Sequence, residues 1–568
     1  MICQFKEFIQ HSGTVSLKSV CWKFQKDLDQ RIVNAALNWR ECFEDGVPII
    51  IEVEDKGTEA YHLHISNEQI RIVGESAAGA FYAIQSLKTM EKDGVVPCCS
   101  IYDYPDMKCR AFYHDVTRGK VPTLETLKSL IDTAAQMKIN MLQLYVEHSF
   151  EFKEYEFCRE QLGYITREEM LELDAYCNDN FIEFVPSLAT FGHLYHLLEN
   201  DSFKHLCELQ NHKPQYHYWM ERQLHHTINP SLEESFDVVR SLLDQYMSVF
   251  TSNKFNICGD ETFDLGRGAN AGKNKGELYY TFIRKIIDYL SSKGKQVMMW
   301  GDVIINHPEF IDQFPDDTIF LPWHYRTEPK SDQFERFHEA GKHMMACPGT
   351  SSWLSFMCRP NILEQNIKKM AEFAYEYEAD GLMNTNWGDW GNVCSIELAL
   401  YGMFCGATVC WNKTVEFDAK FRKEASLLLY GDERVADWLA ELTDIRECAS
   451  WEHVVRYVGA VEIGNEYQVP INTEETFRAN ICRCLELRKM VRCSNNMPEN
   501  VKEELVAACE IHALMTMWIA SVNGIKLECS VSLQEWLGAY QKMWLKKNKR
   551  SELDEIIRVM NKMQQLSH

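Results

Sequence analysis

Two acidic residues stand side by side directly after a short apolar run. The run is KFNIC at 254–258, and it leads into Gly259, Asp260 and Glu261. Neighbouring carboxylates repel each other, and in enzymes such a pair can divide proton transfer and charge stabilisation between its members. The same tripeptide recurs as Gly431-Asp432-Glu433 in a chain with 83 acidic residues, so only the surrounding sequence separates chemistry from chance.

The two triplets stand in different local sequence. Gly431 lies between the helical patterns EASLLLY and RVADWLAELTDI, so we interpret it as a helix stop and Asp432 as a cap for the next helix. Gly259 instead follows a strand-like run and precedes the glycine-rich segment DLGRGANAG. Neighbours in a regular strand point to opposite faces, but both can face one ligand where the strand becomes a loop. Asp260 and Glu261 are therefore candidate catalytic residues, with a pair of solvated loop acids as the alternative.

Tryptophans stand at similar places in several strand-like segments. Three end such segments and a fourth follows one in a loop: Trp300, Trp323, Trp387 and Trp353. A single tryptophan is most often core packing, but three at matching strand ends favour an aromatic cup, because the apolar face of a pyranose ring stacks on indole. Asp389 and Arg110 could supply polar groups for the sugar hydroxyls. Acids flanked by aromatic rings therefore predict a carbohydrate substrate and cleavage of a glycosidic bond.

The elements that must position these residues alternate from residue 109 onward. Eight strand-like runs are separated by amphipathic helical segments; the runs are 109–116, 140–146, 182–188, 254–258, 296–300, 318–323, 343–348 and 381–387. This repetition predicts an α/β fold of the (β/α)8 TIM-barrel type over 106–408. In such a barrel the loops at the carboxyl ends of the strands build the active site, and the acids and tryptophans fall at those ends.

Two further domains are expected beside the barrel. In residues 1–105, three short strands at 47–55, 61–66 and 70–76 precede a helix at 77–91, which predicts a small α/β domain with an antiparallel sheet. The pattern of 409–568 is mostly helical and predicts a carboxy-terminal helical domain.

Composition excludes several classes of function. The chain of 568 residues has a formal net charge of −24 and is 46% hydrophobic. Nucleic acid and anionic membranes require basic surface, so neither is an expected partner. No glycine-rich nucleotide-binding motif follows any of the strands, and no cofactor is expected. A small-molecule glycan is compatible with this charge.

The thiols and the amino-terminal sequence predict a cytoplasmic location. The 21 cysteines are scattered through apolar runs without a C-x-x-C pair, which favours buried, reduced thiols. The first residues, MICQFKEFIQHSG, lack the basic and apolar regions of a secretion signal. No uninterrupted apolar run approaches the roughly 20 residues of a membrane span.

Three stretches together resemble glycoside hydrolase family 20, the exo-β-N-acetylhexosaminidases. Residues 77–90, AAGAFYAIQSLKTM, are similar to the helix that precedes the barrel in that family. Residues 110–152 are similar to its first strand–helix unit and second strand, and FNICGDE at 255–261 falls on its glycine–aspartate–glutamate signature. The resemblance covers the first domain and the barrel, and it implies the (β/α)8 fold and a hydrolase of terminal β-linked N-acetylhexosamine.

The resemblance also implies a mechanism for the two acids. Glu261 matches the general acid/base, and Asp260 matches the residue that holds the 2-acetamido group of the substrate. The acetamide oxygen of the substrate then acts as the nucleophile, an oxazolinium ion forms, and the configuration is retained. Because Glu261 must be protonated while Asp260 stays charged, the like charge and the dry aromatic wall are expected to raise the pKa of the glutamate.

The matching positions imply a set of substrate-binding residues. They are Arg110 for the outer hydroxyls, His193 beside the reaction centre, Trp300, Trp323 and Trp387 as aromatic walls, Asp389 in place of a glutamate, and Glu147 where aspartate is usual; Trp353 lies in a nearby loop. Cys258 replaces the first glycine of the signature. A tyrosine that steadies the acetamide oxygen in the family has no clear match in CPGTSSWLSF, and Tyr325 is a substitute candidate or a packing residue.

Other polar and apolar clusters have simpler interpretations. The stretch HKPQYHYWMERQLHH at 212–226 fits no standard metal-ligand spacing, so we expect no metal and interpret it as a substrate-covering loop or a set of surface histidines. His114 and Asp115 are interpreted as polar structure inside the barrel, with Asp115 placed to brace Arg110. The apolar segment MTMWIASV at 515–522 is a helix core or a homodimer face.

Two alternative functions remain open from the sequence. A conventional retaining glycosidase would use a separate carboxylate nucleophile, such as Glu147 or Asp389. A catalytically weak or inactive sugar-binding protein on the same scaffold is the second alternative, because Cys258 and Asp389 depart from the pattern.

Overall fold

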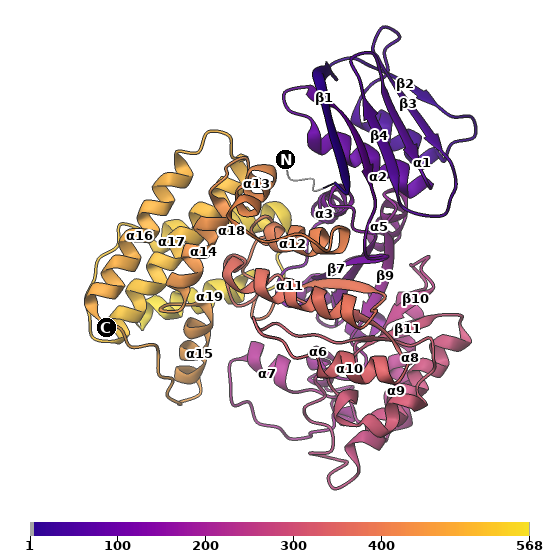
Figure 1. Ribbon diagram of the computed structural model, residues 1–568. Coiled ribbons are helices and arrows are strands. Elements are labelled where there is room, and N and C mark those ends of the chain that lie inside the picture. The colour runs from indigo at the N-terminus through magenta and orange to yellow at the C-terminus, as the bar shows by residue number, and fades with distance from the viewer. Residues whose placement is uncertain (1–4, 567–568) are drawn as a thin grey trace.

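The computed structural model describes residues 5–566, and a closed parallel barrel lies at its centre (Figure 1). All eight strands fall on the predicted runs, and they are β7 (Cys109–Asp115), β8 (Met141–Val146), β9 (Glu183–Leu188), β10 (Lys254–Asn256), β11 (Gln296–Trp300), β12 (Ile319–Leu321), β13 (His343–Ala346) and β14 (Gly381–Asn386). The strands neighbour one another in chain order, and β14 closes the ring by pairing with β7. The predicted (β/α)8 barrel is thus confirmed.

Amphipathic helices surround these strands. The longer ones are α3 (Leu124–Gln136), α5 (Arg167–Asp179), α8 (Glu233–Met247), α9 (Lys275–Ser292), α10 (Asp332–Glu339), α11 (Pro360–Glu376) and α12 (Leu400–Trp411). Side-chain caps fix several starts: Thr123 and Asn274 each accept a backbone N–H, and Thr166 forms a capping box with Glu169. Short helices lie in the loops that follow the carboxyl ends of β8 and β9. They are α4 (Arg159–Leu162), α6 (Tyr195–Leu198) and α7 (Tyr218–Leu224).

The amino-terminal domain is a six-stranded sheet covered by two helices. Its elements are β1 (Glu7–Ser16), β2 (Val20–Phe24), α1 (Gln30–Trp39), β3 (Val47–Val53), β4 (Tyr61–Ile65), β5 (Ile70–Gly74), α2 (Ala77–Met90) and β6 (Val95–Asp103). The expected antiparallel sheet is in fact mixed, because β3 pairs in parallel with both β2 and β5. The helix α1 provides the crossover that a parallel β2–β3 pair needs, and the sequence interpretation did not include β1, β2, α1 or β6.

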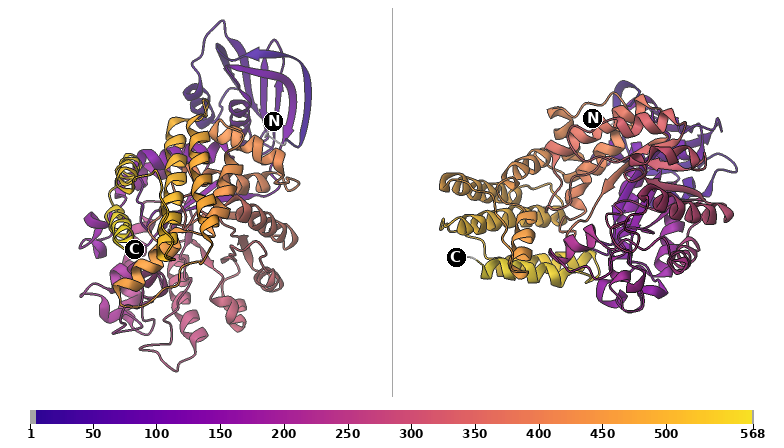
Figure 2. Two further views of the ribbon diagram at one scale, coloured as in Figure 1. Left: turned by 90° about the vertical axis from the view of Figure 1, so that its left-hand side faces the viewer. Right: turned by 90° about the horizontal axis from the view of Figure 1, so that it is seen from below.

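The carboxy-terminal region is helical, as predicted, and packs on one side of the barrel (Figures 1 and 2). Its helices are α13 (Ala419–Tyr430), α14 (Val435–Arg446), α15 (Trp451–Glu462), α16 (Glu474–Arg492), α17 (Glu499–Val522), α18 (Leu533–Lys547) and α19 (Leu553–Gln565). The domain boundary expected at residue 408 falls inside α12, which packs on β14 and β7 and completes the barrel.

One helix of this region has the length and hydropathy of a membrane span. It is α17, whose most apolar window has a mean hydropathy of 1.6, and 72% of that window is buried against the rest of the domain. The segment 515–522 belongs to it, and Met515, Trp518 and Ile519 are buried. The helix-core interpretation of this segment is confirmed.

The second Gly-Asp-Glu triplet has a structural role. Gly431 ends α13 with a φ of 71°, the left-handed conformation that glycine adopts without steric cost. Asp432 accepts hydrogen bonds from the Arg434 backbone (3.1 Å) and the Ser494 hydroxyl (2.7 Å). It therefore closes the turn before α14 rather than capping that helix directly, and nothing places it near the barrel mouth.

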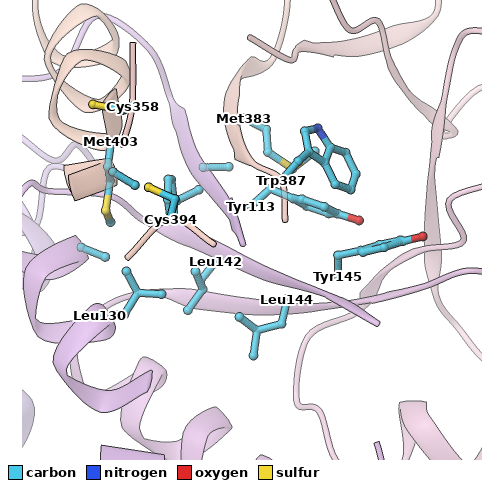
Figure 3. Close-up of a cluster of buried hydrophobic side chains, with 14 of the residues drawn as sticks. Tyr113, Leu130, Leu142, Leu144, Tyr145, Cys358, Met383, Trp387, Cys394 and Met403 are labelled. Atoms are coloured by element: carbon cyan, nitrogen blue, oxygen red, sulfur yellow. The ribbon is translucent and has the colours of Figure 1, made fainter. Parts of the chain in front are cut away.

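Side chains of the barrel strands build the core beneath the site. Leu142 and Leu144 pack toward Leu130 of α3, while the rings of Tyr113 and Tyr145 lie beside Trp387 at the other end of the cluster (Figure 3). The apolar floor of the site is therefore continuous with the barrel core.

The cysteines in the part of the chain that the structure describes are all free thiols.

Candidate functional site

The turn after β10 holds the acid pair in an uncommon backbone conformation. Cys258, Gly259 and Glu261 have φ values of 56°, 81° and 47°, all in the left-handed region. The Tyr279 hydroxyl donates to the Gly259 carbonyl at 2.8 Å, and the Glu261 N–H donates to Asp302 Oδ2 at 3.1 Å. Non-glycine residues with positive φ concentrate strain at functional sites, and here the turn lets two consecutive acids face the same side.

His193 faces both acids. Its Nε2 lies 3.4 Å from Asp260 Oδ2 and 3.5 Å from Glu261 Oε2. Burial lowers the pKa of His193, but the charge and hydrogen bond of Asp260 outweigh burial and raise it above its usual value. A Cβ placed on Gly192 would come within 2.7 Å of the Asp260 carbonyl oxygen, so this glycine lets the two loops approach. His193 thus lies beside both candidate acids, and its place beside a reaction centre stays a prediction.

The two carboxylates differ in their surroundings. Asp260 is 7% exposed, and its Oδ1 is buried without a hydrogen-bond partner among the described residues. Glu261 is more open, with 24% of its side chain exposed. Burial raises the pKa of Glu261; the nearby His193 opposes this and the Asp260 charge adds to it, so the net direction is upward as expected.

Asp302 is a third acid that sequence interpretation missed. It follows β11 two residues after Trp300, is partly buried, and lies close to Asp260. Burial and the Asp260 charge raise the pKa of Asp302 well above that of a free carboxyl. Its hydrogen bond to the Glu261 backbone fixes the turn, and its place at a strand end was the signal that could have identified it.

The expected aromatic walls line the same end of the barrel. Trp300 and Trp387 contact each other with ring centroids 5.7 Å apart, and both contact Tyr113, at 5.3 and 5.0 Å. Tyr145 meets Trp387 edge to face at 5.2 Å. The rings of Tyr113, Tyr145 and Trp387, labelled in Figure 3, form an apolar floor that Trp300 extends.

A second aromatic group continues from this floor. Trp323 stacks on Tyr325 at 5.1 Å, and Trp353 meets Tyr325 edge to face at 5.0 Å. The Trp387 indole donates to the Tyr325 hydroxyl at 2.6 Å, which joins the two groups. Tyr325 thus has a packing role, and its hydroxyl also lies at the wall where the acetamide-binding tyrosine was sought.

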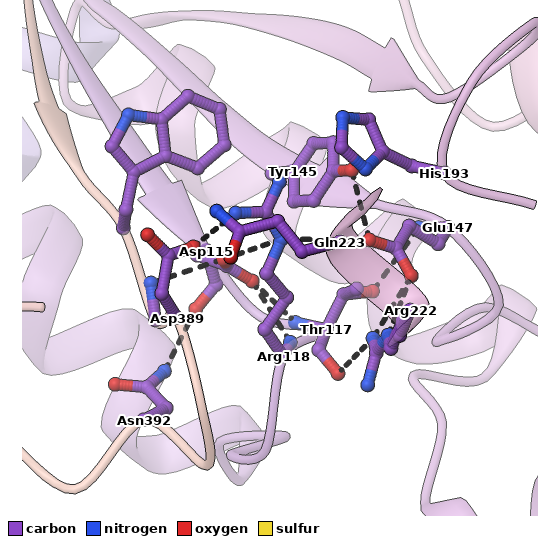
Figure 4. Close-up of polar contacts among 12 residues, drawn as sticks. Asp115, Thr117, Arg118, Tyr145, Glu147, His193, Arg222, Gln223, Asp389 and Asn392 are labelled. Carbon is purple, nitrogen blue, oxygen red and sulfur yellow. Dashed lines mark hydrogen bonds and ion pairs between the residues drawn. The ribbon is translucent and has the colours of Figure 1, made fainter. Parts of the chain in front are cut away.

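Arg118, not Arg110, is the arginine at the mouth of the barrel. Its guanidinium forms an ion pair with Asp389 and lies 3.5 Å from Glu147 Oε1 (Figure 4). The same group stacks over Tyr145 and Trp387, at 4.8 and 4.9 Å from the ring centroids. Arg118 therefore joins the predicted polar residues to the aromatic floor.

Arg110 lies at the opposite end of β7, and its expected substrate contact is wrong. It is 1% exposed and donates to Glu59 at 2.6 Å, the Lys138 carbonyl at 2.7 Å and the Met107 carbonyl at 3.1 Å. Arg110 is the second residue of β7, whereas the loops that bind substrate follow the carboxyl end of a strand. Position within the strand could have placed Arg118, rather than Arg110, at the mouth of the barrel from the sequence alone.

Asp115 braces Arg118, the arginine at the mouth of the barrel. Its Oδ1 accepts the backbone N–H groups of Thr117 (2.9 Å) and Arg118 (3.0 Å), and its Oδ2 accepts that of Gly388 at 3.0 Å. The expected bracing of Arg110 is therefore corrected to Arg118. His114 accepts from the Asn386 side-chain amide at 2.9 Å and is buried, but it faces the surrounding helices, beside Leu130 of α3 and Trp544 of α18, so its expected place inside the barrel is wrong.

Glu147 is buried among cations. It accepts from the Tyr145 hydroxyl at 2.9 Å and from Arg222 Nε at 3.0 Å. Although burial alone would raise the pKa of Glu147, Arg222 and Arg118 outweigh it and lower the pKa below its usual value. Glu147 is therefore a fixed anion that orients two arginines beside the site.

Helix α7 covers this polar cluster, in agreement with the covering-loop interpretation of 212–226. Arg222 reaches Glu147 and the Thr117 carbonyl, and Gln223 lies over the Arg118–Asp389 pair (Figure 4). These residues, with Trp219 and Trp390, enclose a small hollow.

Glu552, just before α19, accepts from Arg222 at 2.7 Å and from the Trp219 indole at 2.5 Å. The carboxy-terminal domain thus anchors the cover, a contact that no local sequence pattern reveals.

Cys258, which stands where the family signature has a glycine, adopts a positive φ of 56° in the turn. Its thiol is buried, 3.5 Å from the Ser187 hydroxyl and 3.7 Å from that of Tyr113. Burial raises the pKa of this thiol to about 12, so it is an inert packing group rather than a nucleophile.

A parallel barrel with acids, an arginine and aromatic rings at the carboxyl ends of its strands is the architecture of a barrel enzyme that binds carbohydrate. Comparison with known families gives the particular class. Residues 108–416 match the model of the glycosyl hydrolase family 20 catalytic domain, and residues 19–104 match the model of its domain 2. The chain belongs to glycoside hydrolase family 20.

Curated relatives of the chain are distant and longer. A β-hexosaminidase of Porphyromonas gingivalis is 25% identical over 297 residues, which are 46% of this chain and 37% of that protein. A lacto-N-biosidase of Bifidobacterium bifidum is 23% identical over 44% of this chain and 23% of that protein. The chain therefore spans well under half the length of these relatives.

Solved structures show the same fold. The β-N-acetylhexosaminidase of Bacteroides fragilis has a TM-score of 0.61 at 20% identity, covering 75% of this chain and 94% of its own. A chitobiase of Flavobacterium johnsoniae has a TM-score of 0.62 at 16% identity, covering 100% of this chain and 98% of its own.

The two arginines provide a direct test of the site. Arg118→Gln should lower kcat/KM on the order of 10²- to 10³-fold, because it removes one partner of a buried charge cluster at the substrate. Arg110→Gln should instead lower the free energy of unfolding by about 3 kcal/mol, because buried carbonyls lose their donor, with kcat/KM retained. Urea unfolding measures the free energy of unfolding of both variants, and steady-state kinetics measure their kcat/KM. Loss of kcat/KM in the Arg110 variant alone would contradict the assignment.

Proposed function

We propose that this protein is a retaining exo-glycosidase that removes terminal β-linked N-acetylhexosamine through participation of the substrate's 2-acetamido group. Glu261 donates a proton to the leaving oxygen and later accepts one from water. Asp260 accepts the amide N–H, which turns the acetamide oxygen toward the anomeric carbon and stabilises the oxazolinium ion. Family membership and the β-hexosaminidase activity named for a relative in Porphyromonas gingivalis support this reaction.

One observation carries the proposal: Asp260 Oδ1 is a buried acceptor with no partner in the described chain. An unpartnered buried acceptor costs free energy, on the order of 1–3 kcal/mol, unless a ligand supplies the donor. The amide N–H of an N-acetylated sugar is such a donor. Its burial next to the indole walls suits an acetamide group, which has both an apolar methyl and a polar amide.

The geometry disfavours a conventional nucleophile. Asp389 is paired with Arg118, and Glu147 is held by Tyr145 and Arg222. Either carboxylate would have to leave a charged partner before attacking a sugar, whereas participation by the substrate needs no such step. Preorganised attack within one bound molecule also contributes several kcal/mol relative to a free nucleophile.

Removal of a terminal sugar, rather than cleavage within a chain, fits the cover over the site. Arg222, Gln223 and Trp390 close the side of the Arg118–Asp389 pair. Arg118 and Asp389 can bind the outer hydroxyls of one sugar ring, and the hollow that these residues line is too small to hold a further ring. The proposed substrate is therefore the non-reducing end of a glycan.

Substitution of Glu261 tests the proton transfer. Glu261→Gln should lower kcat by about 10²- to 10⁴-fold on an aryl N-acetyl-β-glucosaminide, since general acid catalysis of this kind contributes that much. Binding of the product sugar, measured by calorimetry, should persist. Full activity in this variant would exclude Glu261, and a wild-type protein that binds the sugar without ever releasing the aryl alcohol would support the sugar-binding alternative.

The pH profile tests the electrostatics of the same glutamate. His193 lowers the pKa of Glu261, so removal of the imidazole in His193→Asn should raise it. Because Glu261 must be protonated to act as the acid, the alkaline limb of kcat/KM should move to higher pH in this variant. A limb that stays in place or moves to lower pH would show that another group controls it.

A further inference from the structure

A second cluster of ligand-type side chains lies in the covering segment, apart from the catalytic acids. Atoms of His212, Glu221 and His225 lie within 4.8 Å of one another. His212 Nε2 is 2.6 Å from Glu221 Oε2, and His225 Nε2 is 3.8 Å from the same oxygen. The two imidazole rings are in contact, with centroids 3.8 Å apart and planes tilted by 34°. Three ligand atoms thus converge from a loop and the end of α7.

The remaining atoms of this cluster already have partners. His225 Nδ1 lies 2.9 Å from Asp264 Oδ1, and Glu221 Oε1 accepts the backbone N–H groups of Gln215 and Tyr216, at 2.5 and 2.8 Å. A carboxylate on the far nitrogen of a histidine fixes the tautomer and ring orientation that present the other nitrogen to a metal. The outer contacts therefore leave His225 Nε2 and Glu221 Oε2 directed at each other and at His212.

We propose that His212, Glu221 and His225 bind one Zn²⁺ ion, with water as the fourth ligand. Two histidines and a carboxylate are a recognised zinc donor set, and ligand atoms of a tetrahedral zinc lie about 3.3 Å apart. The distances from Glu221 Oε2 to His212 Nε2 (2.6 Å) and to His225 Nε2 (3.8 Å) lie on either side of that value. Shifts of these atoms by less than about 1 Å therefore bring both distances to it. Glu221 is buried, while the His212 and His225 side chains are 15% and 12% exposed, which leaves an approach for the ion and its water.

Hydrogen bonds alone account for this arrangement less well. They explain the contacts of His212 with Glu221 and of His225 with Asp264, but a separation of 3.8 Å is too long for a hydrogen bond from His225 to Glu221. The sequence predicted no metal because the spacing of these residues matches no standard set, and the site is assembled by the fold of the segment rather than by one motif.

The ion would join the cover to the catalytic loop. Glu221 precedes Arg222, which holds Glu147, and Asp264 lies three residues after Glu261 in the loop that follows β10. Asp264 also accepts the His226 backbone N–H at 2.9 Å. We assign the ion a structural role, fixing α7 over the substrate site, and this role does not depend on the reaction proposed above.

Metal content of the full-length protein tests the site. After treatment with a chelator and equilibrium dialysis against Zn²⁺, the wild type should retain one more ion per chain than His212→Ala/His225→Ala, and Zn²⁺ should raise the Tm of the wild type only. A matched control is His205→Ala/His343→Ala, which removes two exposed histidines that also pair with carboxylates, at 3.0 and 2.9 Å. The control should bind as the wild type does.

Two further measurements keep the test decisive. Co²⁺ bound to the wild type should show the visible absorption of a tetrahedral site, which requires no variant to fold. Glu261→Gln should keep the ion, because His193, Asp260 and Glu261 form another group that could attract a metal. Absence of the Co²⁺ bands, loss of the ion in Glu261→Gln, or equal binding by the wild type and the His212/His225 variant would each overturn the proposal.

Discussion

The site depends on the close placement of two carboxylates that repel each other. Asp260 and Glu261 are consecutive, and a turn with positive φ at Cys258, Gly259 and Glu261 directs them to one side. The imidazole of His193 lies within 3.5 Å of both and offsets part of the repulsion. Burial, together with the part of the Asp260 charge that His193 does not offset, raises the pKa of Glu261, as the proposed proton donor requires, while Asp260 Oδ1 is buried without a hydrogen-bond partner among the described residues. The two neighbouring carboxylates thus have different surroundings, and the proposed reaction gives each of them a different role.

Support for this turn comes from parts of the chain that are far apart. Asp302 holds the Glu261 backbone from β11, and Arg118 connects Asp389 after β14 with Glu147 after β8. Glu552, near the end of the chain, anchors the covering helix through Arg222. The carboxy-terminal domain therefore contributes to the substrate site, although none of its residues was a candidate from the sequence.

The sequence predicted the features that depend on local pattern. All eight barrel strands followed from apolar runs and helical periodicity, and the acid pair followed from its place at a strand end. The strands β1 and β2 were missed because an exposed edge strand and a short parallel strand carry little apolar pattern. The sequence interpretation placed Arg110 rather than Arg118 at the site, because it did not consider that Arg110 begins β7 and Arg118 follows its carboxyl end. The His212, Glu221 and His225 cluster could not be predicted, since its spacing has meaning only once the loop and α7 are folded. Cytoplasmic location and a homodimer stay predictions from the sequence.

Progressive fluorination of the substrate's N-acetyl group tests the central claim most directly. Each fluorine withdraws electrons from the acetamide oxygen and makes it a weaker nucleophile, while the aryl leaving group stays the same. If that oxygen attacks the anomeric carbon with Asp260 orienting the amide, kcat/KM should fall steeply from the acetyl to the trifluoroacetyl substrate. A nearly constant kcat/KM across the series would contradict the account and would assign the attack to a carboxylate of the protein.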